Sequence, residues 1–488
     1  MTSTSRGLAA SSARAAVLPL ALAQFICSYA ASNMNVAITT IATELGTSIT
    51  GIQTAITLFT LTMAALMIPG SKLTDLLGRK VCFVAGLVVY GAGALLALLA
   101  QGLPLLVVGY SLLQGVGSAL LIPPIYILIT VLFDDLKTRA RWFGVVSGSA
   151  GLGAAAGPLI GGLITSYISW RASFGLQALV VIAIIWLARR VQDPPLPAER
   201  PQFDVLGAVF SAIGLFFVVF GVLQTGTYGW VRAKKDVTIG STVLIAQGGV
   251  SPVWILVGIG LVFLALFILH VHNRERNGRT PLVSIRLFQN RTSNLGLVTQ
   301  NMQWLVMQGS FFVISVYLQQ ERGLSPISTG LMLIPATIGI LLASAGAQRM
   351  AGRHSQRLLV RVGFTLTVAG IALILGLTAW RHTADWTFWP GLFVMGFGLG
   401  TMLTASVNVV QSAWPEAAQG DISGVSRSVS NLGSSLGVAI AGSVMVAAAA
   451  SAVQYGISVV VVGAFALVGW VAAVLLPREA RSEEPAPA

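Results

Sequence analysis

The sequence predicts an all-α protein that crosses a membrane many times. Hydrophobic residues make up 55% of the 488 residues and charged residues only 9%, whereas soluble domains carry about 25% charged residues. A chain of this composition cannot bury its apolar surface in one core, so lipid must cover much of it. Long apolar runs recur along the whole chain, and one glycine-rich segment returns near the C-terminus.

A helix needs about 20 apolar residues to cross the hydrocarbon layer, and about fourteen runs reach that length. In chain order, the expected spans are 15–40, 51–70, 81–100, 104–132, 142–167, 174–190, 204–225, 250–270, 292–318, 326–348, 357–379, 388–412, 421–448 and 457–476. The first run continues past the possible cleavage site near Ala30-Ala31, so we expect it to remain as a span rather than to act as a signal peptide.

The positions of Lys and Arg predict the orientation, because cytoplasmic loops carry an excess of positive charge. With the N-terminus in the cytoplasm, 23 of the 29 Lys and Arg residues fall inside and 6 outside. The six outside residues are Arg171, Arg232, Lys234, Lys235, Arg322 and Arg381. We therefore expect a multi-pass protein of the cell (plasma or inner) membrane with both termini in the cytoplasm. The same distribution explains the net charge of +13 without a nucleic-acid partner.

The linkers divide the expected chain into two six-helix bundles with two extra central helices between them. The expected segments are a cytoplasmic tail at 1–14, an N-terminal bundle at 15–190, a linker with the extra helices at 191–291, a C-terminal bundle at 292–476 and a cytoplasmic tail at 477–488.

We expect no metal and no cofactor. Cys27 and Cys82 lie in apolar runs, so they imply no disulfide framework. His270 and His272 form the only close histidine pair, and we expect both to be solvated at a helix end. The expected partners are a small-molecule substrate and the lipid bilayer, with no nucleic acid, and we expect a monomer.

A glycine-rich segment, residues 144–162, organises the chain. Seven of its nineteen residues are glycine, and none is charged. Gly153, Gly157 and Gly161 recur every fourth residue, so they share one helix face that lets a second helix approach closely. Pro158 removes one hydrogen bond of the helix, so a bend is expected there. A close helix contact without any chemistry is the alternative to a gating role.

The glycine segment has a counterpart 280 residues later in the chain. Its glycines Gly144, Gly153, Gly157 and Gly162 match Gly424, Gly433, Gly437 and Gly442. A repeat at this distance indicates two related halves, which many transporters have.

A charged segment, Gly70–Lys80, joins the second and third expected spans. Gly70 and Gly78 are expected to allow a tight cytoplasmic turn. Asp75 and Arg79 are four residues apart and can pair on a helix. We expect this pair to hold one conformational state, and an ordinary positively charged loop is the alternative.

These two segments resemble the signatures of the major facilitator superfamily. The loop is similar to the family's cytoplasmic motif, and Gly144, Gly153, Gly157-Pro158 and Gly161-Gly162 resemble its antiporter motif. The number of spans and the central extra pair are similar to its fourteen-helix drug/proton antiporter branch. The resemblance implies the major facilitator fold and a multidrug efflux transporter rather than an enzyme. It also implies alternating access and export of amphipathic, drug-like small molecules by proton antiport.

Two positions depart from the family pattern. The acid of the first span is replaced by Ala30, and the arginine of the fourth span by Ser111. No Asp or Glu falls near the middle of an expected span, although such groups usually mark proton paths. We therefore expect weak or absent proton coupling, or coupling through a peripheral acid such as Asp75 or Asp204. The alternatives are an uncoupled facilitator and a membrane sensor or scaffold that does not transport.

Polar residues within the spans are the candidates for a substrate cavity. They are Asn33, Asn35, Tyr110, Gln114, Asn301, Trp304, Gln308, Asn408, Arg427 and Asn431. Hydrogen bonding between helices is the alternative use of these side chains. Arg427 follows shortly after the start of its span, so for this residue we favour extension to the membrane interface over a place in the cavity. A cavity without carboxylates favours neutral or anionic substrates over dications.

Overall fold

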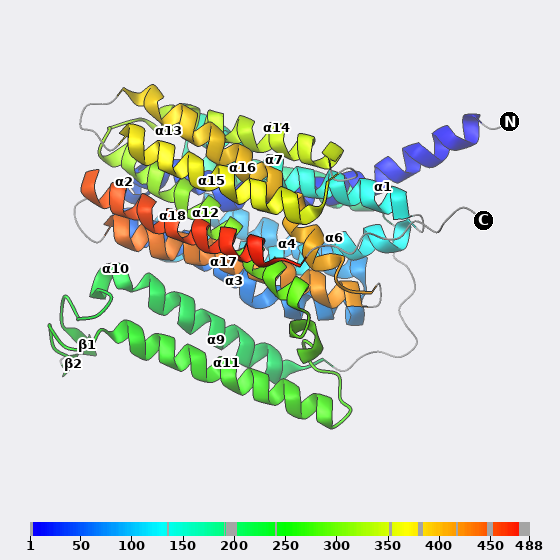
Figure 1. Cartoon of the computed structure of the whole chain (residues 1–488), viewed down its shortest axis with the longest axis horizontal. Helices are drawn as coiled ribbons and strands as arrows, with labels where there is room; N and C mark the ends of the chain where they lie inside the picture. Colours follow the sequence, from blue (N-terminus) through cyan, green and yellow to red (C-terminus); the bar gives the residue numbers. More distant parts are fainter. Residues whose placement is uncertain are drawn as a thin grey trace.

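Long helices that lie roughly along one axis make up most of the molecule (Figure 1). The structure is a computed structural model and describes residues 3–133, 136–189, 191, 203–239, 242–350, 354–378, 384–415, 418–446 and 452–477. The long helices are α1 Ser3–Asn33, α3 Ile49–Leu77, α4 Arg79–Leu98, α6 Gly115–Leu132, α7 Leu136–Tyr167, α8 Trp170–Ala188, α9 Val205–Leu223, α11 Pro252–Arg276, α12 Arg291–Gln320, α14 Ile334–Met350, α15 Gln356–Thr378, α16 Phe388–Gln411, α17 Gln419–Val446 and α18 Ala452–Leu475.

Short elements connect or interrupt these helices. They are η1 Met34–Val36, α2 Ile38–Glu44, α5 Leu103–Leu106, η2 Val107–Gln114, α10 Thr225–Tyr228, η3 Ile285–Phe288, α13 Pro326–Met332 and η4 Asp385–Thr387. The strands β1 Val237–Ile239 and β2 Thr242–Ile245 pair antiparallel at one end of the molecule (Figure 1). The element η2 is a π-helix that continues from α5 into α6.

Eleven described helical segments are long and apolar enough to cross a membrane, and twelve if the bent pair α13–α14 forms one span. The helices α12 and α17 are long enough to cross a membrane, with 30 and 28 residues, but they are more polar and are not among these eleven segments. The predicted all-α, multi-pass fold is therefore confirmed, while the count of fourteen spans is approximate.

Gly78 forms the turn between α3 and α4, as the sequence predicts. Its φ of 102° lies in the region that favours glycine. Gly70 was expected in the same turn, and that expectation is wrong because α3 continues to Leu77. A Cβ on Gly70 would overlap the carbonyl oxygen of Ala119. Gly70 therefore allows α6 to approach α3 rather than allowing the chain to turn.

The glycine face of α7 packs against the backbone of α1. A Cβ on Gly153 would overlap the carbonyl oxygen of Phe25, and one on Gly157 would overlap the Ser32 side chain. At Gly161, the nearest atom to an added Cβ is the Asn33 carbonyl oxygen, at 2.9 Å. The predicted close contact is present, and α7 runs through Pro158 without interruption. Gly144 takes no part in it, since nothing lies within 4 Å of its Cβ position.

The same contact recurs between α17 and α12. A Cβ on Gly433 would overlap the carbonyl oxygen of Asn301, and one on Gly437 would overlap that of Leu305. The hydrophobic effect does not drive helices together within lipid, so their association depends on close van der Waals packing. Small residues allow this packing because the backbone of the neighbouring helix can approach them closely. The repeat in the sequence thus corresponds to a repeated helix pair.

Other helix contacts follow the same repeat. The helix α4 packs against α6 and α8, and its counterpart α15 packs against α16 and α18. In the same way, α1 packs against α8, and its counterpart α12 packs against α18. We call α1 and α3–α8 the N-terminal group, and α12–α18 the C-terminal group. The two groups meet where α3 lies against α17 and where α7 lies against α13 and α14. The residue limits assigned to the two bundles stay a prediction.

The helices α9 and α11 pack on each other and lie along one side of the molecule (Figure 1). Of the two, α9 contacts α3 and α17. Asp204 begins α9, because its side chain accepts a hydrogen bond from the backbone N–H of Gly207 at 3.0 Å. The helix α11 is mostly exposed, as expected of a helix that faces lipid.

We expect Gly157→Leu to destabilise the protein by about 1–3 kcal/mol, because the new side chain would collide with Ser32 and Asn33. Gly144→Leu is the matched control on the same helix, since its Cβ position is open. Thermal unfolding of the purified protein in detergent compares the two variants. An equal loss of thermal stability in both variants would contradict the close contact at Gly157.

Candidate functional site

A cavity of about 430 Å³ lies between the N-terminal and C-terminal groups. We call it the central cavity, and it is lined by Gln24, Cys27, Ser28, Ala31, Met63, Ile122, Trp304, Arg427, Ser430, Asn431 and Ser434. Trp304 supplies an aromatic wall, and among the lining residues that the structure describes Arg427 is the one that is charged and none is acidic.

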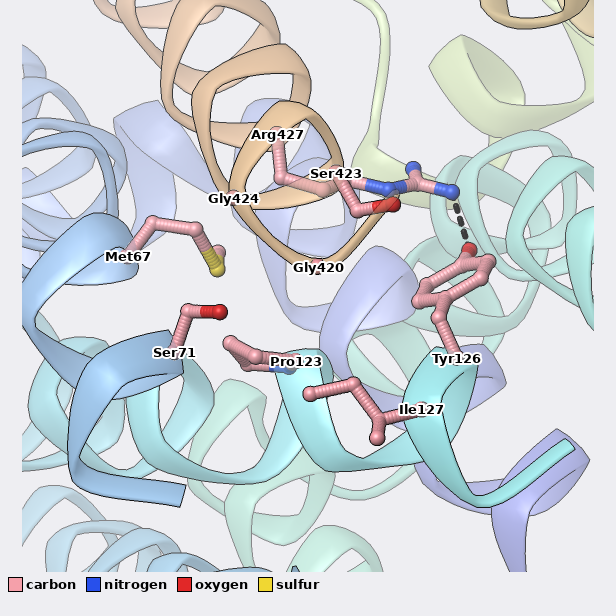
Figure 2. Close-up of a pocket in the computed structure, with 9 residues that line it drawn as sticks. All are labelled: Met67, Ser71, Pro123, Tyr126, Ile127, Gly420, Ser423, Gly424 and Arg427. Atoms are coloured by element: carbon pink, nitrogen blue, oxygen red, sulfur yellow. Dashed lines mark hydrogen bonds between the residues drawn. The ribbon is translucent and has the colours of Figure 1, made fainter. Parts of the chain in front are cut away.

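Arg427 extends from α17 across the boundary between the groups to α6. Its guanidinium carbon lies 4.5 Å from the ring centre of Tyr126, and Nη2 donates a hydrogen bond to the Tyr126 hydroxyl (Figure 2). The Tyr126 hydroxyl in turn donates to Gln24 Oε1 at 3.5 Å. The arginine is therefore held between the two groups in this structure, and its extension to the membrane interface stays a prediction.

A second pocket, of about 230 Å³, adjoins the central cavity on the side of the Gly78 turn. We call it the Tyr126 pocket, and it is lined by Met67, Ser71, Pro123, Tyr126, Ile127, Gly420, Ser423, Gly424 and Arg427 (Figure 2). Arg427 borders both spaces, so the pair of Arg427 and Tyr126 stands between them.

Of the ten predicted cavity residues, Trp304, Arg427 and Asn431 line the central cavity. Asn301 and Gln308 lie on the same helix as Trp304 but make hydrogen bonds to other helices. Asn301 Nδ2 donates to the Val429 carbonyl at 2.8 Å, and Gln308 Nε2 donates to the Ala31 carbonyl at 2.9 Å. The expected polar face of α12 is therefore divided between the cavity and helix contacts.

Tyr110 and Gln114 also bond to other helices. The Tyr110 hydroxyl donates to the Ala30 carbonyl at 3.0 Å, and Gln114 Nε2 donates to Gln177 Oε1 at 3.0 Å. Both side chains are fully buried in the N-terminal group. Buried amides and hydroxyls need such partners, so the bonding alternative describes these residues in this structure.

The three remaining candidates lie near helix ends. Asn33 packs against Gly161, and the Asn35 carbonyl accepts a hydrogen bond from Gln319 Nε2 at 3.2 Å. The side chain of Asn35 is buried, and neither its Oδ1 nor its Nδ2 has a hydrogen-bond partner among the residues that the structure describes. Asn408 is half-buried, three residues before the end of α16. The structure places none of the three in the lining of the central cavity.

The missed cavity residues follow a helical spacing that the sequence does contain. Ser430 and Ser434 lie three and seven residues after Arg427, which places them on neighbouring parts of one α17 face. Gln24 and Ser28 are four residues apart on α1 and bond to each other. A search for polar residues at this spacing would have found both pairs.

Contacts between the two groups flank the central cavity on both sides. On the side of the Gly78 turn, Lys72 Nζ lies 2.5 Å from Asp421 Oδ1. On the other side, Gln53 Nε2 donates to the Val438 carbonyl at 3.0 Å. The ion pair of Lys72 and Asp421 was not predicted from the sequence. It joins the ends of α3 and α17, where a change in the distance between the groups would break it.

The predicted gating residues have different environments. A Cβ on Gly162 would lie 2.7 Å from the Pro326 carbonyl, and one on Gly330 would lie 2.7 Å from the Pro158 carbonyl. Gly162 and Pro158 therefore belong to the contact of α7 with α13 between the groups. Arg79 is the first residue of α4. The side chain of Asp75 lies outside the described residues, so its pairing with Arg79 stays a prediction.

A buried polar cluster joins α9, α11 and the segment after α11. Asp204 Oδ1 lies 2.8 Å from His270 Nε2 and 3.7 Å from Arg274 Nη1, and Asp204 Oδ2 accepts from the Leu282 N–H at 3.1 Å. Burial raises the pKa of the Asp204 carboxyl, but hydrogen bonds from Gly207, His270 and Leu282 outweigh it and hold the pKa below the usual 3.8. The expectation that His270 is solvated is therefore wrong.

Comparison with known proteins gives one consistent family. The model of the Major Facilitator Superfamily matches residues 20–238 and 236–438 of this chain. A probable actinorhodin transporter of Streptomyces coelicolor is 27% identical over 423 residues, which cover 84% of this chain and 68% of that protein. The cephamycin export protein CmcT of Amycolatopsis lactamdurans is 26% identical over 496 residues, covering 99% of this chain and 96% of that protein.

Two further matches agree. Multidrug resistance protein Stp of Mycobacterium tuberculosis is 23% identical over 414 residues, covering 85% of this chain and 72% of that protein. Among solved structures, the human organic anion transporter MFSD10 (TETRAN) has a TM-score of 0.58 at 14% identity. That match covers 94% of this chain and 99% of the other, and at this identity it supports the fold alone.

We expect Asp421→Asn to raise the labelling rate of a cysteine placed at Ser423, because the ion pair that joins α3 to α17 is lost. A partly exposed ion pair contributes about 0.2–1 kcal/mol, so the rate should rise by up to about fivefold. The background carries alanine at Cys27 and Cys82. The double variant Lys72→Asp, Asp421→Lys, which reverses the ion pair, should restore slow labelling. An unchanged labelling rate in Asp421→Asn would contradict the idea that this ion pair holds the two groups together.

We expect Asp204→Asn to lower the stability by about 2–3 kcal/mol, because a buried charged acceptor with several donors is lost. The folded-state pKa lies below 3.8, so the wild type keeps this contribution above that pH and loses it as the pH falls through the lower folded value. Thermal unfolding over a pH series measures both effects. Glu321→Gln is the exposed control, and a variant with wild-type stability and pH dependence contradicts the structural role.

Proposed function

Because the chain belongs to the Major Facilitator Superfamily, a family of multi-pass membrane transporters, we propose that it exports amphipathic, drug-like small molecules across the cell membrane. The names of its relatives support this proposal. They include an export protein for cephamycin, a multidrug resistance protein and a probable actinorhodin transporter. Membership in a transporter family also agrees with the prediction that the chain is not an enzyme.

The observation that carries the proposal is the central cavity, which is built by both groups and flanked by contacts between them on both sides. A transporter exposes one site to each side in turn by moving two such groups against each other. Separation of the groups at the pair of Lys72 and Asp421 would expose the cavity on the side of the Gly78 turn. Separation at the bond of Gln53 to α17 would expose it on the other side.

We assign the Gly78 turn to the cytoplasmic side. The predicted orientation supports this assignment, since it places most Lys and Arg residues, including Lys72, Arg79 and Lys80, in the cytoplasm. Both termini then lie in the cytoplasm, and lipid covers the exposed apolar faces of the outer helices. A monomer is sufficient for this arrangement, because one chain contributes both groups that line the cavity.

We further propose that transport is weakly coupled to protons, or not coupled. Ala30 is fully buried, and the Ser111 hydroxyl donates to the Ala55 carbonyl at 2.7 Å. Neither position offers a group that exchanges protons near neutral pH. Asp204 is a poor candidate as well, because its lowered pKa and its partners keep it charged. Without coupling, the substrate moves along its own concentration gradient.

Transport of an amphipathic aromatic dye by the purified protein in vesicles tests both the proposed export and the proposed lack of proton coupling. We expect saturable dye movement whose initial rate is unchanged by an imposed pH gradient, because the described lining of the central cavity contains no Asp, Glu or His to exchange a proton. Vesicles without protein give the background rate of the dye. Dye-dependent proton flux with a fixed stoichiometry contradicts the coupling proposal. Correctly inserted protein that moves no dye contradicts export and favours the sensor or scaffold.

A further inference from the structure

We propose that Arg427 binds an acidic group of the substrate, so that the central cavity accepts amphipathic aromatic anions that carry a carboxylate. This inference rests on the proposed export function and specifies its substrate class. It starts from a charge in the cavity that the described residues leave without a counter-ion.

The charge on Arg427 has no acidic partner in the part of the chain that the structure describes. None of the ion pairs found there includes Arg427, and neither the central cavity nor the Tyr126 pocket has an acidic lining residue. The contacting group, Tyr126, is neutral. A cation inside a membrane protein is costly unless it is paired or faces a polar cavity, and it usually marks a functional site.

The guanidinium of Arg427 also has N–H donors that the bond to Tyr126 does not use. Arginine has five N–H donors in a planar fork, and the interaction with Tyr126 uses one of them in a hydrogen bond. A carboxylate can accept two parallel bonds from such a fork, which makes the interaction strong and directional. Because Arg427 borders both the central cavity and the Tyr126 pocket, an anion can reach it from either space.

The other walls of the central cavity suit the remainder of an amphipathic molecule. Trp304, Met63 and Ile122 supply aromatic and apolar surface from three different helices. Ser430 and Asn431 lie on α17 three and four residues after Arg427, so their polar side chains extend the same helix face. An acidic group at Arg427 and an aromatic ring toward Trp304 would satisfy both parts of the lining.

A purely structural role is the competing explanation. In that case Arg427 serves only to join α17 to Tyr126 on α6, and the cavity has no preference for charge. The two explanations differ in one measurable property. A structural arginine affects all ligands alike, whereas a binding arginine affects anionic ligands selectively.

The test uses three probes that share one ring system: 2-naphthoate, its neutral methyl ester and the 2-naphthylmethylammonium cation. Binding is measured by equilibrium dialysis to protein in lipid nanodiscs, and transport of naphthoate is measured in vesicles. The variants are Arg427→Gln, the charge-preserving Arg427→Lys, and Arg276→Gln as a control. Arg276 is exposed at the end of α11, outside both the central cavity and the Tyr126 pocket.

We expect the wild type to bind naphthoate about tenfold more tightly than the ester, and the cation more weakly than either. Arg427→Gln should lose the preference for naphthoate while it binds the ester as the wild type does, which also shows that it is folded. Arg427→Lys should keep part of the preference, and Arg276→Gln should keep all of it.

Two results overturn the inference. One is a wild type that binds the ester or the cation at least as tightly as naphthoate, and the other is an equal loss of all three probes in Arg427→Gln. Neither result contradicts the export function if the protein in vesicles still transports a probe. Conversely, binding of naphthoate that depends on Arg427, in a protein that transports none of the probes, supports the anion site and contradicts export.

Discussion

The close approach of α7 to α1, and of α17 to α12, is the contact on which the rest of the structure depends. At Gly153, Gly157, Gly433 and Gly437 there is no room for a Cβ, because the backbone of the neighbouring helix occupies that space. In lipid such packing replaces the hydrophobic effect as the force between helices. It also fixes the rotation of α17, so that the helix face next to its glycines, which bears Arg427 and Asn431, lines the central cavity.

Polar side chains in the spans serve two purposes. Tyr110, Gln114, Asn301 and Gln308 join helices through hydrogen bonds. Trp304, Arg427 and Asn431 line a space instead. The first set must be satisfied because an unpaired polar group in an apolar interior is costly. The second set has space beside it, and this difference in surroundings distinguishes a structural residue from a candidate binding residue.

Charge balance connects the cavity to the proposed function. Lys72 is paired with Asp421 and Arg274 with Asp204, whereas Arg427 contacts the neutral Tyr126. A substrate that supplies the missing negative charge would compete with Tyr126 for the guanidinium and change a contact between the two groups. Substrate binding and movement of the groups would then share one residue, and transport of this kind needs no protonatable acid inside the membrane.

The sequence alone determined the fold class, the two related halves and the glycine contacts, because composition, periodicity and small residues act locally along a helix. It also identified Trp304, Arg427 and Asn431 as candidates. The tertiary structure decided which polar residues face a cavity, since helices far apart in the chain form its walls. It likewise decided the pairs of Lys72 with Asp421 and of Asp204 with His270. Such pairs depend on the distance between whole helices, which no local pattern in the sequence records.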